Sequence, residues 1–517
     1  MVNRSSRKSR PSSSAALKEK YRKLVARETG AVIKDPGGRL PVAVVYANNY
    51  RIGMSNLGFH QLYRLLNDYP GTLAERFFYE GADQPGISLE TFTPLGEFPL
   101  VLFSISWELD YFNIPVILDA SGVPVYAKDR SEEHPIIIAG GACIMANPVP
   151  IAPFFDCLAI GEAEVLLPGI RGIMSDPGLN RCEKLKALAG VPGMLVPGYS
   201  DDLPVKRVYL EDLDRESCQT AIITPDAEFG HMYMVEVQRG CGRGCNFCMV
   251  NCVFAPLRFR SLENLLSSAR EGYKHCNQIA LVGPLVSAHP QVAELVAGIR
   301  EMGAQVSTSS LAVKPLPEEL LVELTGAGAR SVTMALEAGS HELRRRAGKH
   351  FSDAEILDSV AKVARAGFDA LKLYFMAGLP GETEDDIEAM KKLVLECQRV
   401  YGRKSLSINI APFVPKPFTK FEREAVLPLD VLEERLACLN RGLSARKVKV
   451  KIESPAWSRM QAVLSRGDER LAPVIAELGK PTLTRWKRAL EAAGINDGEF
   501  LGAIPESKVL PWRVISL

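Results

Sequence analysis

Three cysteines on one short loop constrain this chain more than any other feature. Cys241, Cys245 and Cys248 follow the spacing C-x3-C-x2-C. Three thiolates at this spacing can ligate three irons of a [4Fe-4S] cube, which leaves the fourth iron open to a substrate or cofactor. The glycines that alternate with the first two cysteines allow backbone angles closed to other residues and a close approach to the cluster. We therefore expect an iron-sulfur site on a tight loop.

A structural zinc site is the alternative interpretation of these cysteines. Zinc usually takes four protein ligands arranged as paired C-x2-C motifs, and this run offers three in a different spacing. Cys252, four residues further on, is a candidate fourth ligand, but we expect it to pack at the start of the following segment. The spacing thus favours the iron-sulfur cluster.

The composition bears on compartment and partners. With 517 residues, the chain is long enough for about three domains of roughly 150 residues. A formal net charge of +1 gives no general attraction to nucleic acid or anionic membranes. Eleven cysteines without an N-terminal secretory signal predict reduced thiols and a cytoplasmic location. The most apolar stretch, 135–161, is interrupted by prolines and glycines, so we expect no membrane span.

Strands and helices alternate regularly from residue 232 onward. Short apolar runs predict strands, and helices with apolar residues on one face separate them. The predicted strands are 232–238, 279–282, 305–309, 330–336, 369–375 and 405–410. Strands that each cross over through a helix form right-handed parallel units. We therefore expect an α/β fold that includes a partial (β/α)6 TIM-type barrel over residues 225–425.

Four of these strands carry polar side chains on one face and apolar side chains on the other. Period-two alternation places the apolar set against the helices and the polar set in the barrel interior. A polar interior predicts a ligand cavity, and Glu337, Lys372 and Tyr374 are its candidate catalytic residues. The alternative is that the polar groups only satisfy one another inside a structural barrel.

The cysteine loop and the segments after it resemble the radical S-adenosylmethionine (SAM) superfamily over residues 231–420. The resemblance implies that Phe247 lies beside the adenine of SAM, and that Ser309 and Ser310 lie near the ribose. Gly283 stands at the glycine-rich turn that meets the SAM amino group, although the usual Gly-Gly-Glu is absent. Glu337 begins the segment Glu-Ala-Gly-Ser, which is similar to a segment in the branch with methylthiotransferases and cobalamin-dependent enzymes. We therefore include Glu337 among the expected cofactor-binding residues.

This resemblance implies an enzyme. In the family the open iron binds the amino and carboxylate groups of SAM, and one electron from the cluster cleaves SAM to a 5'-deoxyadenosyl radical. The radical then abstracts hydrogen from a substrate that nothing in the sequence identifies. A low-potential electron donor such as ferredoxin or flavodoxin is the implied partner, and the protein's own task is to bind, orient and exclude water.

Residues 36–220 predict a separate α/β layer in front of the barrel. Its short apolar strands end in loops that carry Asn48, Ser104, Gly140 and Gly141, and ligands of such sheets bind beyond the carboxyl ends of the strands. The order resembles the Rossmann-like, doubly wound cobalamin-binding domain that is fused to many radical SAM enzymes. The resemblance implies that these four residues contact the cofactor.

Cobalamin binding itself is left open by the sequence. The related domains often carry Asp-x-His-x-x-Gly, whose histidine ligates cobalt, and this chain has no such motif. His60 lies in the helix just beyond the expected place, where we expect a hydrogen-bonded structural histidine. In one interpretation cobalamin binds without a histidine ligand, and the product is a methylated carbon or phosphorus centre. In the other the domain is a scaffold and substrate clamp.

The two ends of the chain lack the alternating pattern. Residues 1–35 are basic and serine-rich with few large apolar groups, which predicts a disordered tail rather than a nucleic-acid arm. Residues 426–517 predict a small helical C-terminal extension. Its basic stretch 446–451 is typical of a solvated face; the alternative is contact with RNA phosphates, but the neutral net charge argues against nucleic acid as a partner.

Two other functions compete with the radical SAM interpretation. A methylthiotransferase-like reaction, or another radical modification of RNA or protein, would need further cysteines for an auxiliary cluster, and the remaining cysteines are scattered. A non-catalytic iron-sulfur electron carrier or sensor explains neither the polar barrel interior nor the SAM-like turns. We therefore expect a radical SAM enzyme, with cobalamin-dependent methyl transfer as one form of it.

Overall fold

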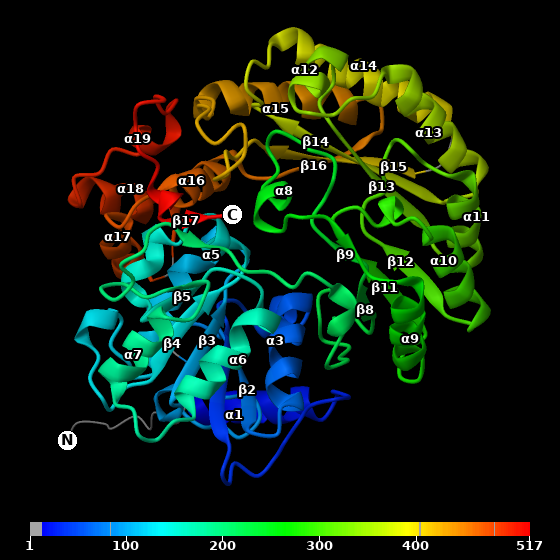
Figure 1. The fold of residues 1–517 in the computed structure, drawn as a ribbon. Helices are drawn as coiled ribbons and strands as arrows, with labels where there is room; N and C mark the ends of the chain where they lie inside the picture. The colour runs from blue at the N-terminus through cyan, green and yellow to red at the C-terminus, as the bar shows by residue number, and fades with distance from the viewer. Residues whose placement is uncertain (1–12, 83, 403–404, 480) are drawn as a thin grey trace, which may run out of the picture.

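Two groups of parallel strands organise the molecule, one in each half of the chain (Figure 1). The structure is a computed structural model, which describes residues 13–82, 84–402, 405–479 and 481–517. Within these residues, no helix combines the length and the apolar character that crossing a membrane requires.

The first group is a single sheet in the N-terminal half. Its strands are β1 Leu40–Tyr46, β2 Thr72–Phe78, β3 Leu100–Ser104, β4 Ile136–Gly140, β5 Cys157–Ala159 and β6 Met194–Leu195. They lie in the order β2-β1-β3-β4-β5-β6, and all neighbours are parallel except β5 and β6. Because β1 and β3 are almost entirely buried, the sheet needs a covering layer on each face.

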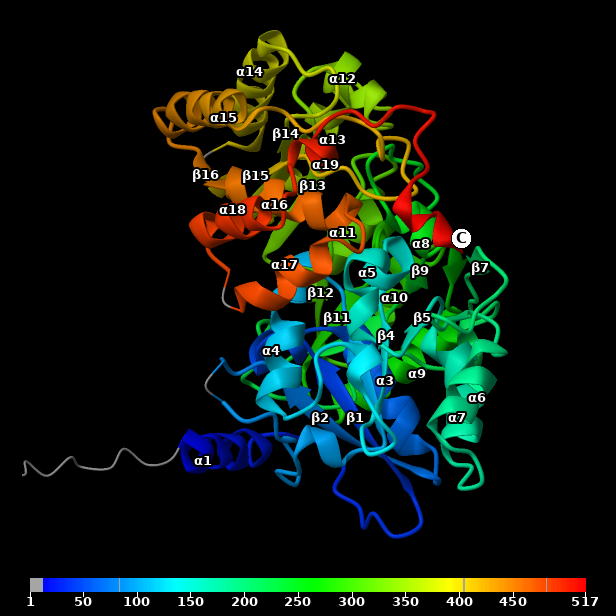
Figure 2. The same cartoon turned by 90° about the vertical axis from the view of Figure 1, so that its left-hand side faces the viewer.

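Distant parts of the chain supply these two layers. The helices are α1 Ser13–Val25, α3 Leu57–Asp68, α4 Asn113–Ala120, α6 Ala163–Met174, α7 Arg181–Ala189, α16 Pro455–Arg466, α17 Leu471–Leu478, α18 Leu483–Ala492 and α19 Gly498–Leu501. One face packs against α1, α3, α6 and α7. The other packs against α4 and the C-terminal helices α16 to α19 (Figure 2). The predicted C-terminal extension therefore completes the core of the N-terminal sheet.

The second group of strands follows the pattern predicted from residue 232 onward. Its members are β8 Tyr233–Glu236, β11 Gln278–Val282, β12 Gln305–Thr308, β13 Ser331–Glu337, β14 Ala370–Ala377, β15 Ser405–Pro412 and β16 Lys449–Ile452. They form two parallel sheets with the orders β12-β11-β8 and β13-β14-β15-β16. A parallel bridge between Leu311 and Met334 joins the two sheets.

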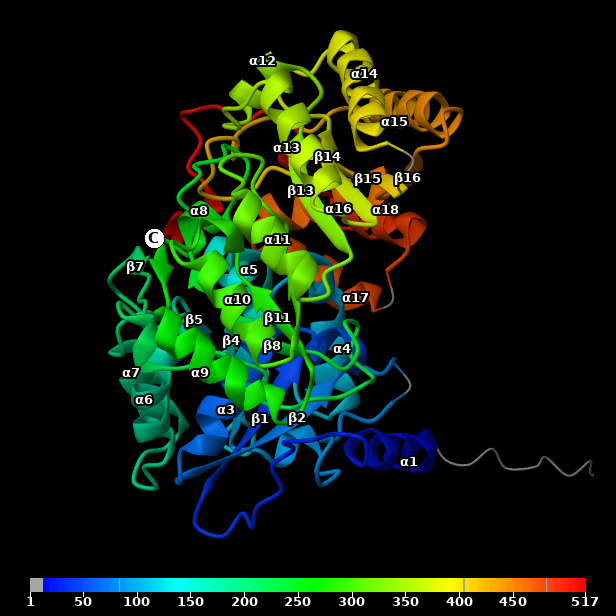
Figure 3. The same ribbon diagram turned by 90° about the vertical axis from the view of Figure 1, so that its right-hand side faces the viewer.

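An outer layer of helices covers these two sheets (Figure 3). The helices are α9 Leu262–Tyr273, α10 Val292–Glu301, α11 Glu318–Gly326, α13 Asp353–Arg365, α14 Glu384–Tyr401 and α15 Leu429–Ser444. Their apolar faces meet the apolar faces of the strands in one continuous core. The helix starts are fixed locally, as at α13, where the Glu355 amide donates to Ser352 Oγ at 3.3 Å and the Ser352 amide donates to Glu355 at 2.8 Å.

Short elements complete the fold. They are α2 Tyr50–Gly53, α5 Ala142–Ala146, α8 Val250–Val253, α12 His341–Arg346, β7 Val205–Lys206, β9 Gln238–Arg239, β10 Arg258–Phe259 and β17 Ile515–Ser516. The predicted strand 232–238 is thus divided into β8 and β9, and β9 pairs with β10 in antiparallel fashion. At the other end, β17 pairs with β7, which ties the C-terminus to the N-terminal half.

One sequence prediction about the ends of the chain is wrong in detail. Residues 13–25, predicted as part of a disordered tail, form α1 because Leu17 and Tyr21 bury their side chains in the N-terminal core. Tertiary contacts stabilise a short helix that its own composition does not. Residues 1–12 of that tail lie outside the described residues. The basic stretch 446–451 runs into the strand β16, where lysine alternates with valine and isoleucine. Its basic side chains are exposed, in agreement with the predicted solvated face.

Candidate functional site

The cysteine loop begins at the carboxyl end of β9. At one of its positions the surrounding backbone leaves no room for a side chain, so only glycine fits there. Gly240 has a φ of +73°, and a Cβ there would lie 2.7 Å from the carbonyl oxygens of Phe254 and Pro256. Gly244 also has a left-handed φ of +66°. Glycine is therefore required to bring the loop back over the segment that follows it.

The turn after α12 forms the opposite wall of the loop. Gly348 has a φ of +83°, and a Cβ on it would lie 3.0 Å from the Cα of Cys245. The backbone amide of Asn246 donates to the Ala347 carbonyl at 3.0 Å, and its side-chain amide donates to the Arg346 carbonyl at 2.8 Å. A segment about a hundred residues downstream thus fixes the middle of the loop.

Cys241, Cys245 and Cys248 are all free thiols, and all three are partly buried. Burial raises the pKa of Cys245 to about 11, and the nearby Lys349 opposes that shift. Burial also raises the pKa of Cys248. In the described part of the chain, no three or more His, Cys, Asp or Glu side chains converge to hold a metal ion. A cube presents a different iron to each thiolate, so its ligands need not converge on one point, and an all-thiol donor set fits it.

Cys252 does not join the other three. It lies in α8, and its thiol donates to the Phe418 carbonyl at 3.1 Å. This position agrees with the expectation that Cys252 packs in the segment after the loop.

Glu337 stands at the carboxyl end of β13 with an unusual backbone. Its φ is +71°, and the register of β13 with β14 shifts at this residue. Its carboxylate forms an ion pair with Lys349 at 3.1 Å, and both side chains are largely buried. A left-handed non-glycine residue costs free energy that the surrounding structure must supply, and such residues concentrate at functional sites. The pair places one negative and one positive charge beside the cysteine loop.

Segments that are far apart in the sequence meet around Phe247. Its ring packs against a small apolar cluster made of Ala338, Leu343, Ala347, Leu379, Phe413 and Phe421. The Glu-Ala-Gly-Ser segment is held in place at Gly339, where a Cβ would lie 2.2 Å from the backbone nitrogen of Met390 in α14. The residues that carry the family resemblance therefore share one corner of the fold.

The loops after β11 and β12 are joined to each other. The Ser309 hydroxyl donates to the Gly283 carbonyl at 2.9 Å, and Ser310 follows on the same loop, partly buried. Gln238, which sequence reasoning placed only on a polar strand face, lies against Gly283. Its amide nitrogen donates to the Gly240 carbonyl at 3.2 Å, and its amide oxygen is buried without a hydrogen-bond partner among the described residues.

Lys372 and Tyr374 lie on the inner face of β14, as the alternation predicts. Both are exposed, whereas Leu371, Leu373 and Phe375 on the opposite face are buried. They stand nearer the middle of the strand than the position of Phe375, which is in register with Glu337. The structure therefore places these two candidate catalytic residues one and three positions before the level of Glu337 along the strands.

A cavity of about 530 Å³ opens at the carboxyl ends of β3, β4 and β5. Ser104, Gly140 and Gly141 line it. Gly141 has a φ of +110°, and a Cβ there would lie 2.5 Å from the Ile105 carbonyl oxygen. The apolar floor between α3 and α6 is made of Leu62, Leu102, Ile138, Leu166, Leu167 and Ile170. Its far wall comes from the second half of the chain, through Glu236, Arg239, Phe254 and Val282.

Asn48 and His60 both have structural partners in this half. The Asn48 side chain donates to Asp110 at 2.7 Å, and Asn48 does not line the cavity. Asn56 and Ser106, which the sequence did not single out, line it instead. His60 is buried, its Nδ1 accepts from the Ala221 amide at 3.2 Å, and burial lowers its pKa to about 4. The expected structural role of His60 agrees with these contacts.

A buried ion network connects this cavity to the cysteine loop. Arg239, two residues before Cys241, binds Glu162 at 2.8 Å and Glu164 at 2.6 Å, and Glu236 at 2.9 Å. Arg258 binds Glu162 at 2.7 Å. Because Glu162 and Glu164 are distant in sequence from Arg239 and Arg258, no local pattern predicts these ion pairs.

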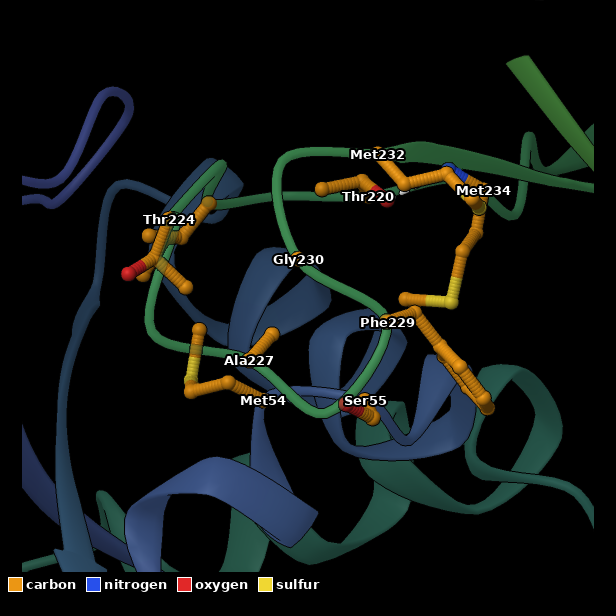
Figure 4. A pocket seen from close by; sticks show the side chains of 10 residues that line it. Met54, Ser55, Thr220, Thr224, Ala227, Phe229, Gly230, Met232 and Met234 are labelled. Atoms are coloured by element: carbon orange, nitrogen blue, oxygen red, sulfur yellow. Dashed lines mark hydrogen bonds between the residues drawn. The ribbon is translucent and has the colours of Figure 1, made fainter. Parts of the chain in front are cut away.

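A second hollow is too small for a cofactor. It has a volume of about 10 Å³ and lies under the segment that joins the two halves (Figure 4). Its lining includes Met54, Phe229, Met232 and Met234. A space of this size holds no more than about one water molecule.

Comparisons with known proteins identify the family. A model described as "Radical SAM proteins, N-terminal" matches residues 58–197, and one described as "Radical SAM superfamily" matches residues 235–394. An uncharacterized protein of Methanocaldococcus jannaschii is 30% identical over 449 residues, which cover 85% of this chain and 92% of that protein. A tRNA-2-methylthio-N(6)-dimethylallyladenosine synthase of Sorangium cellulosum is 26% identical over 46% of this chain and only 53% of its own length.

Solved structures with the same fold agree with these matches. The radical S-adenosylmethionine methyltransferase TsrM from Kitasatospora setae, with cobalamin and a [4Fe-4S] cluster bound, aligns with a TM-score of 0.51 at 13% identity, over 74% of this chain and 77% of that chain. The cobalamin-dependent S-adenosylmethionine radical enzyme OxsB aligns with a TM-score of 0.50 at 16% identity, over 69% and 52%. At these identities the likeness shows the fold. Together with the sequence matches, it shows that this chain belongs to the radical SAM superfamily of enzymes.

Proposed function

We propose that Cys241, Cys245 and Cys248 hold a [4Fe-4S] cluster and that the protein cleaves SAM reductively. The observation that carries this proposal is the cysteine loop itself, which presents three free thiols between required glycines. When bound, the cluster supplies the electron that converts SAM to methionine and a 5'-deoxyadenosyl radical. A low-potential donor such as ferredoxin or flavodoxin would supply that electron.

We assign SAM binding to the residues around this loop. Phe247, Gly283, Ser309, Ser310 and Glu337 are the proposed contacts. The buried, unpartnered amide oxygen of Gln238 supports a ligand next to Gly283, because a buried acceptor without a donor costs free energy until a ligand N–H or O–H satisfies it. The Glu337–Lys349 pair keeps a carboxylate beside the loop without leaving an uncompensated charge. Lys372 and Tyr374 are left to contact substrate.

We also propose a partial barrel over residues 225–425 and a Rossmann-like domain over residues 36–220. The bridge between Leu311 and Met334 supports the barrel, because it continues the parallel order from one sheet to the next. The order β2-β1-β3-β4-β5 supports the second assignment, since doubly wound sheets use it and bind ligands beyond the strand ends. Within residues 426–517, α16 to α19 cover this domain, whereas α15 and β16 belong to the second group of strands.

The N-terminal cavity favours cobalamin over a scaffold role. It is lined by glycines and hydroxyls at the strand ends and by apolar side chains below them, as a ligand with polar edges and a large apolar surface requires. It also faces the barrel through Arg239. Because His60 is held by structural hydrogen bonds, it is not available to ligate cobalt, and cobalamin would bind without a protein ligand to the metal. The proposed reaction is then methyl transfer to a carbon or phosphorus centre of a substrate not yet identified.

Anaerobic reconstitution tests the cluster and the SAM chemistry. Iron and sulfide are added to the full chain, and bound iron is counted, with about four per chain expected. After addition of SAM and dithionite, 5'-deoxyadenosine is measured by chromatography. Cys245→Ala should abolish both the iron and the product, whereas Cys252→Ala should retain both. An intact cluster that yields no 5'-deoxyadenosine would favour the electron-carrier alternative.

Hydroxocobalamin binding tests the N-terminal half separately. The corrinoid is added to the full chain, and the visible spectrum is recorded after gel filtration. Gly140→Leu should abolish binding, because Gly140 lines the cavity and a side chain there would fill it. Gly172→Leu, on α6 with nothing within 4 Å of its Cβ, is the matched control. If the wild-type protein emerges from gel filtration without corrinoid, cobalamin binding is refuted and the scaffold interpretation remains.

A further inference from the structure

We infer that the barrel interior binds a small anionic substrate, one that carries phosphate or carboxylate groups, through three lysines on β14 and β16. The inference rests on the proposed function, because it names the substrate class of the same site. Lys372, Lys449 and Lys451 are the residues concerned, and the two from β16 lie in the stretch that the sequence presents only as a run of basic residues.

The strand register places the three lysines on one face. Lys372 is in register with Ser407, which is in register with Lys449. One step further along the strands, Tyr374 is in register with Asn409, and Asn409 with Lys451. Side chains at matched positions of parallel strands point to the same side of the sheet. The two rows therefore form a continuous polar face, which we call the lysine face.

The opposite face of the same strands identifies the lysine face as the inner one. Leu373, Ile408 and Val450 occupy matched positions on the neighbouring rows. They pack into the core beneath α14 and α15, the helices on the outer side of this sheet (Figure 1). Since side chains alternate along a strand, the lysine face points away from those helices and toward the barrel interior.

The three lysines are free to bind an anion. All three are exposed, and none forms an ion pair with any described residue. Lys349 and Lys416, by contrast, are paired with Glu337 and Glu108. Lys449 and Lys451 lie on β16, and Ser407 and Asn409 of β15 separate them from Lys372 of β14. An anion bound among the three lysines would reduce the repulsion between their like charges.

Asn409 supplies a second sign of a ligand between the lysines. Its amide nitrogen donates to Glu453 at 3.4 Å, so one carboxylate lies at the end of the face. Its amide oxygen is buried and accepts no hydrogen bond within the described part of the chain. A ligand that bears a hydroxyl or N–H besides its anionic group would satisfy this oxygen.

A small anion fits this face better than nucleic acid does. The lysines stand on the face of the sheet that points away from α14 and α15, and not on the outer faces of helices. The net charge of the whole chain is only +1, which gives no broad positive field for a polynucleotide. The substrate class is therefore a small molecule with one or more phosphates or carboxylates.

Calorimetric titration of the full chain without cluster tests the inference. The probes are inorganic pyrophosphate and citrate at low ionic strength, and binding of at least one with a Kd below about 1 mM is expected. The variant with Lys372→Gln, Lys449→Gln and Lys451→Gln should weaken that binding by about tenfold or more. Preference between the two probes distinguishes phosphate from carboxylate.

A second triple variant controls for net charge. Lys186→Gln, Lys392→Gln and Lys487→Gln remove three exposed lysines from the outer faces of α7, α14 and α18 and should leave binding unchanged. Failure of both probes to bind, equal losses in both triple variants, or tight binding of bulk tRNA through the same lysines would overturn the inference. Because no cluster is needed, failure here with normal 5'-deoxyadenosine formation refutes the substrate class alone, and the reverse result refutes the proposed function alone.

Discussion

At the scale of single residues, Gly348 is distant in sequence from the three cysteines but contacts their loop, and we expect it to decide whether that loop can form. Gly348→Ala should lower the iron content after reconstitution to less than about half, because its Cβ would press on Cys245. Gly367→Ala is the control, since Gly367 also has a left-handed φ, of +95°, but its Cβ would meet nothing within 4 Å. Both variants should lose about 1–2 kcal/mol of stability. Equal iron in the two variants would mean that the loop tolerates the contact.

His60 should make the stability of the fold depend on pH. Its folded pKa of about 4 lies below the usual 6.5, so the neutral form is favoured in the folded state. The contribution of neutral His60 to the free energy of unfolding is fully present above pH 6.5. It is lost as the pH falls toward 4, by on the order of 2–3 kcal/mol. Urea unfolding at pH 7.5 and pH 5 measures this loss, which should be smaller in His60→Gln. An identical pH dependence in the variant would show that other groups account for it.

At the scale of elements, the stem of the cysteine loop and the start of α6 are joined by charges rather than by apolar packing. Arg239→Gln would leave Glu164 without its counter-ion and Glu162 without one of its arginines, and it should cost about 3 kcal/mol or more in free energy of unfolding. Arg51→Gln removes an exposed pair with Glu228 and should cost less than about 1 kcal/mol. Chemical denaturation compares the two. A small loss in Arg239→Gln would show that the halves are joined mainly by other contacts.

At the scale of the whole molecule, the N-terminal sheet depends on helices made at the end of the chain. Trp486 of α18 is 5% exposed and packs edge-on against Phe112 at a centroid distance of 5.7 Å. Trp486→Ala should cost about 3–5 kcal/mol, whereas Trp107→Ala, at 46% exposure, should cost little. Thermal unfolding measures both.

Removal of residues 454–517, which contain α16 to α19, extends this prediction. The truncated chain should lose its cooperative transition and aggregate, because one face of the N-terminal sheet would be exposed to water. A soluble truncated protein with a single sharp transition would show that the N-terminal half folds without its C-terminal cover.

The sequence by itself determined the features whose causes are local. The spacing of Cys241, Cys245 and Cys248 is readable because neighbouring residues on one loop can supply ligands together. The alternation on β14 around Lys372 and Tyr374 is readable because strand geometry assigns each residue a face. The same reasoning applies to the parallel strand and helix order of the second half, and the family resemblance follows that order.

Only the tertiary structure decided which distant residues meet. Lys349 beside Cys245, Arg239 beside Glu162, and the direction of Asn48 toward Asp110 join positions separated by many residues, and no periodicity connects them. The C-terminal helices became part of the N-terminal core for the same reason. An apolar helix face indicates that something must cover it, but which surface does so is fixed by the free energy of packing the whole chain.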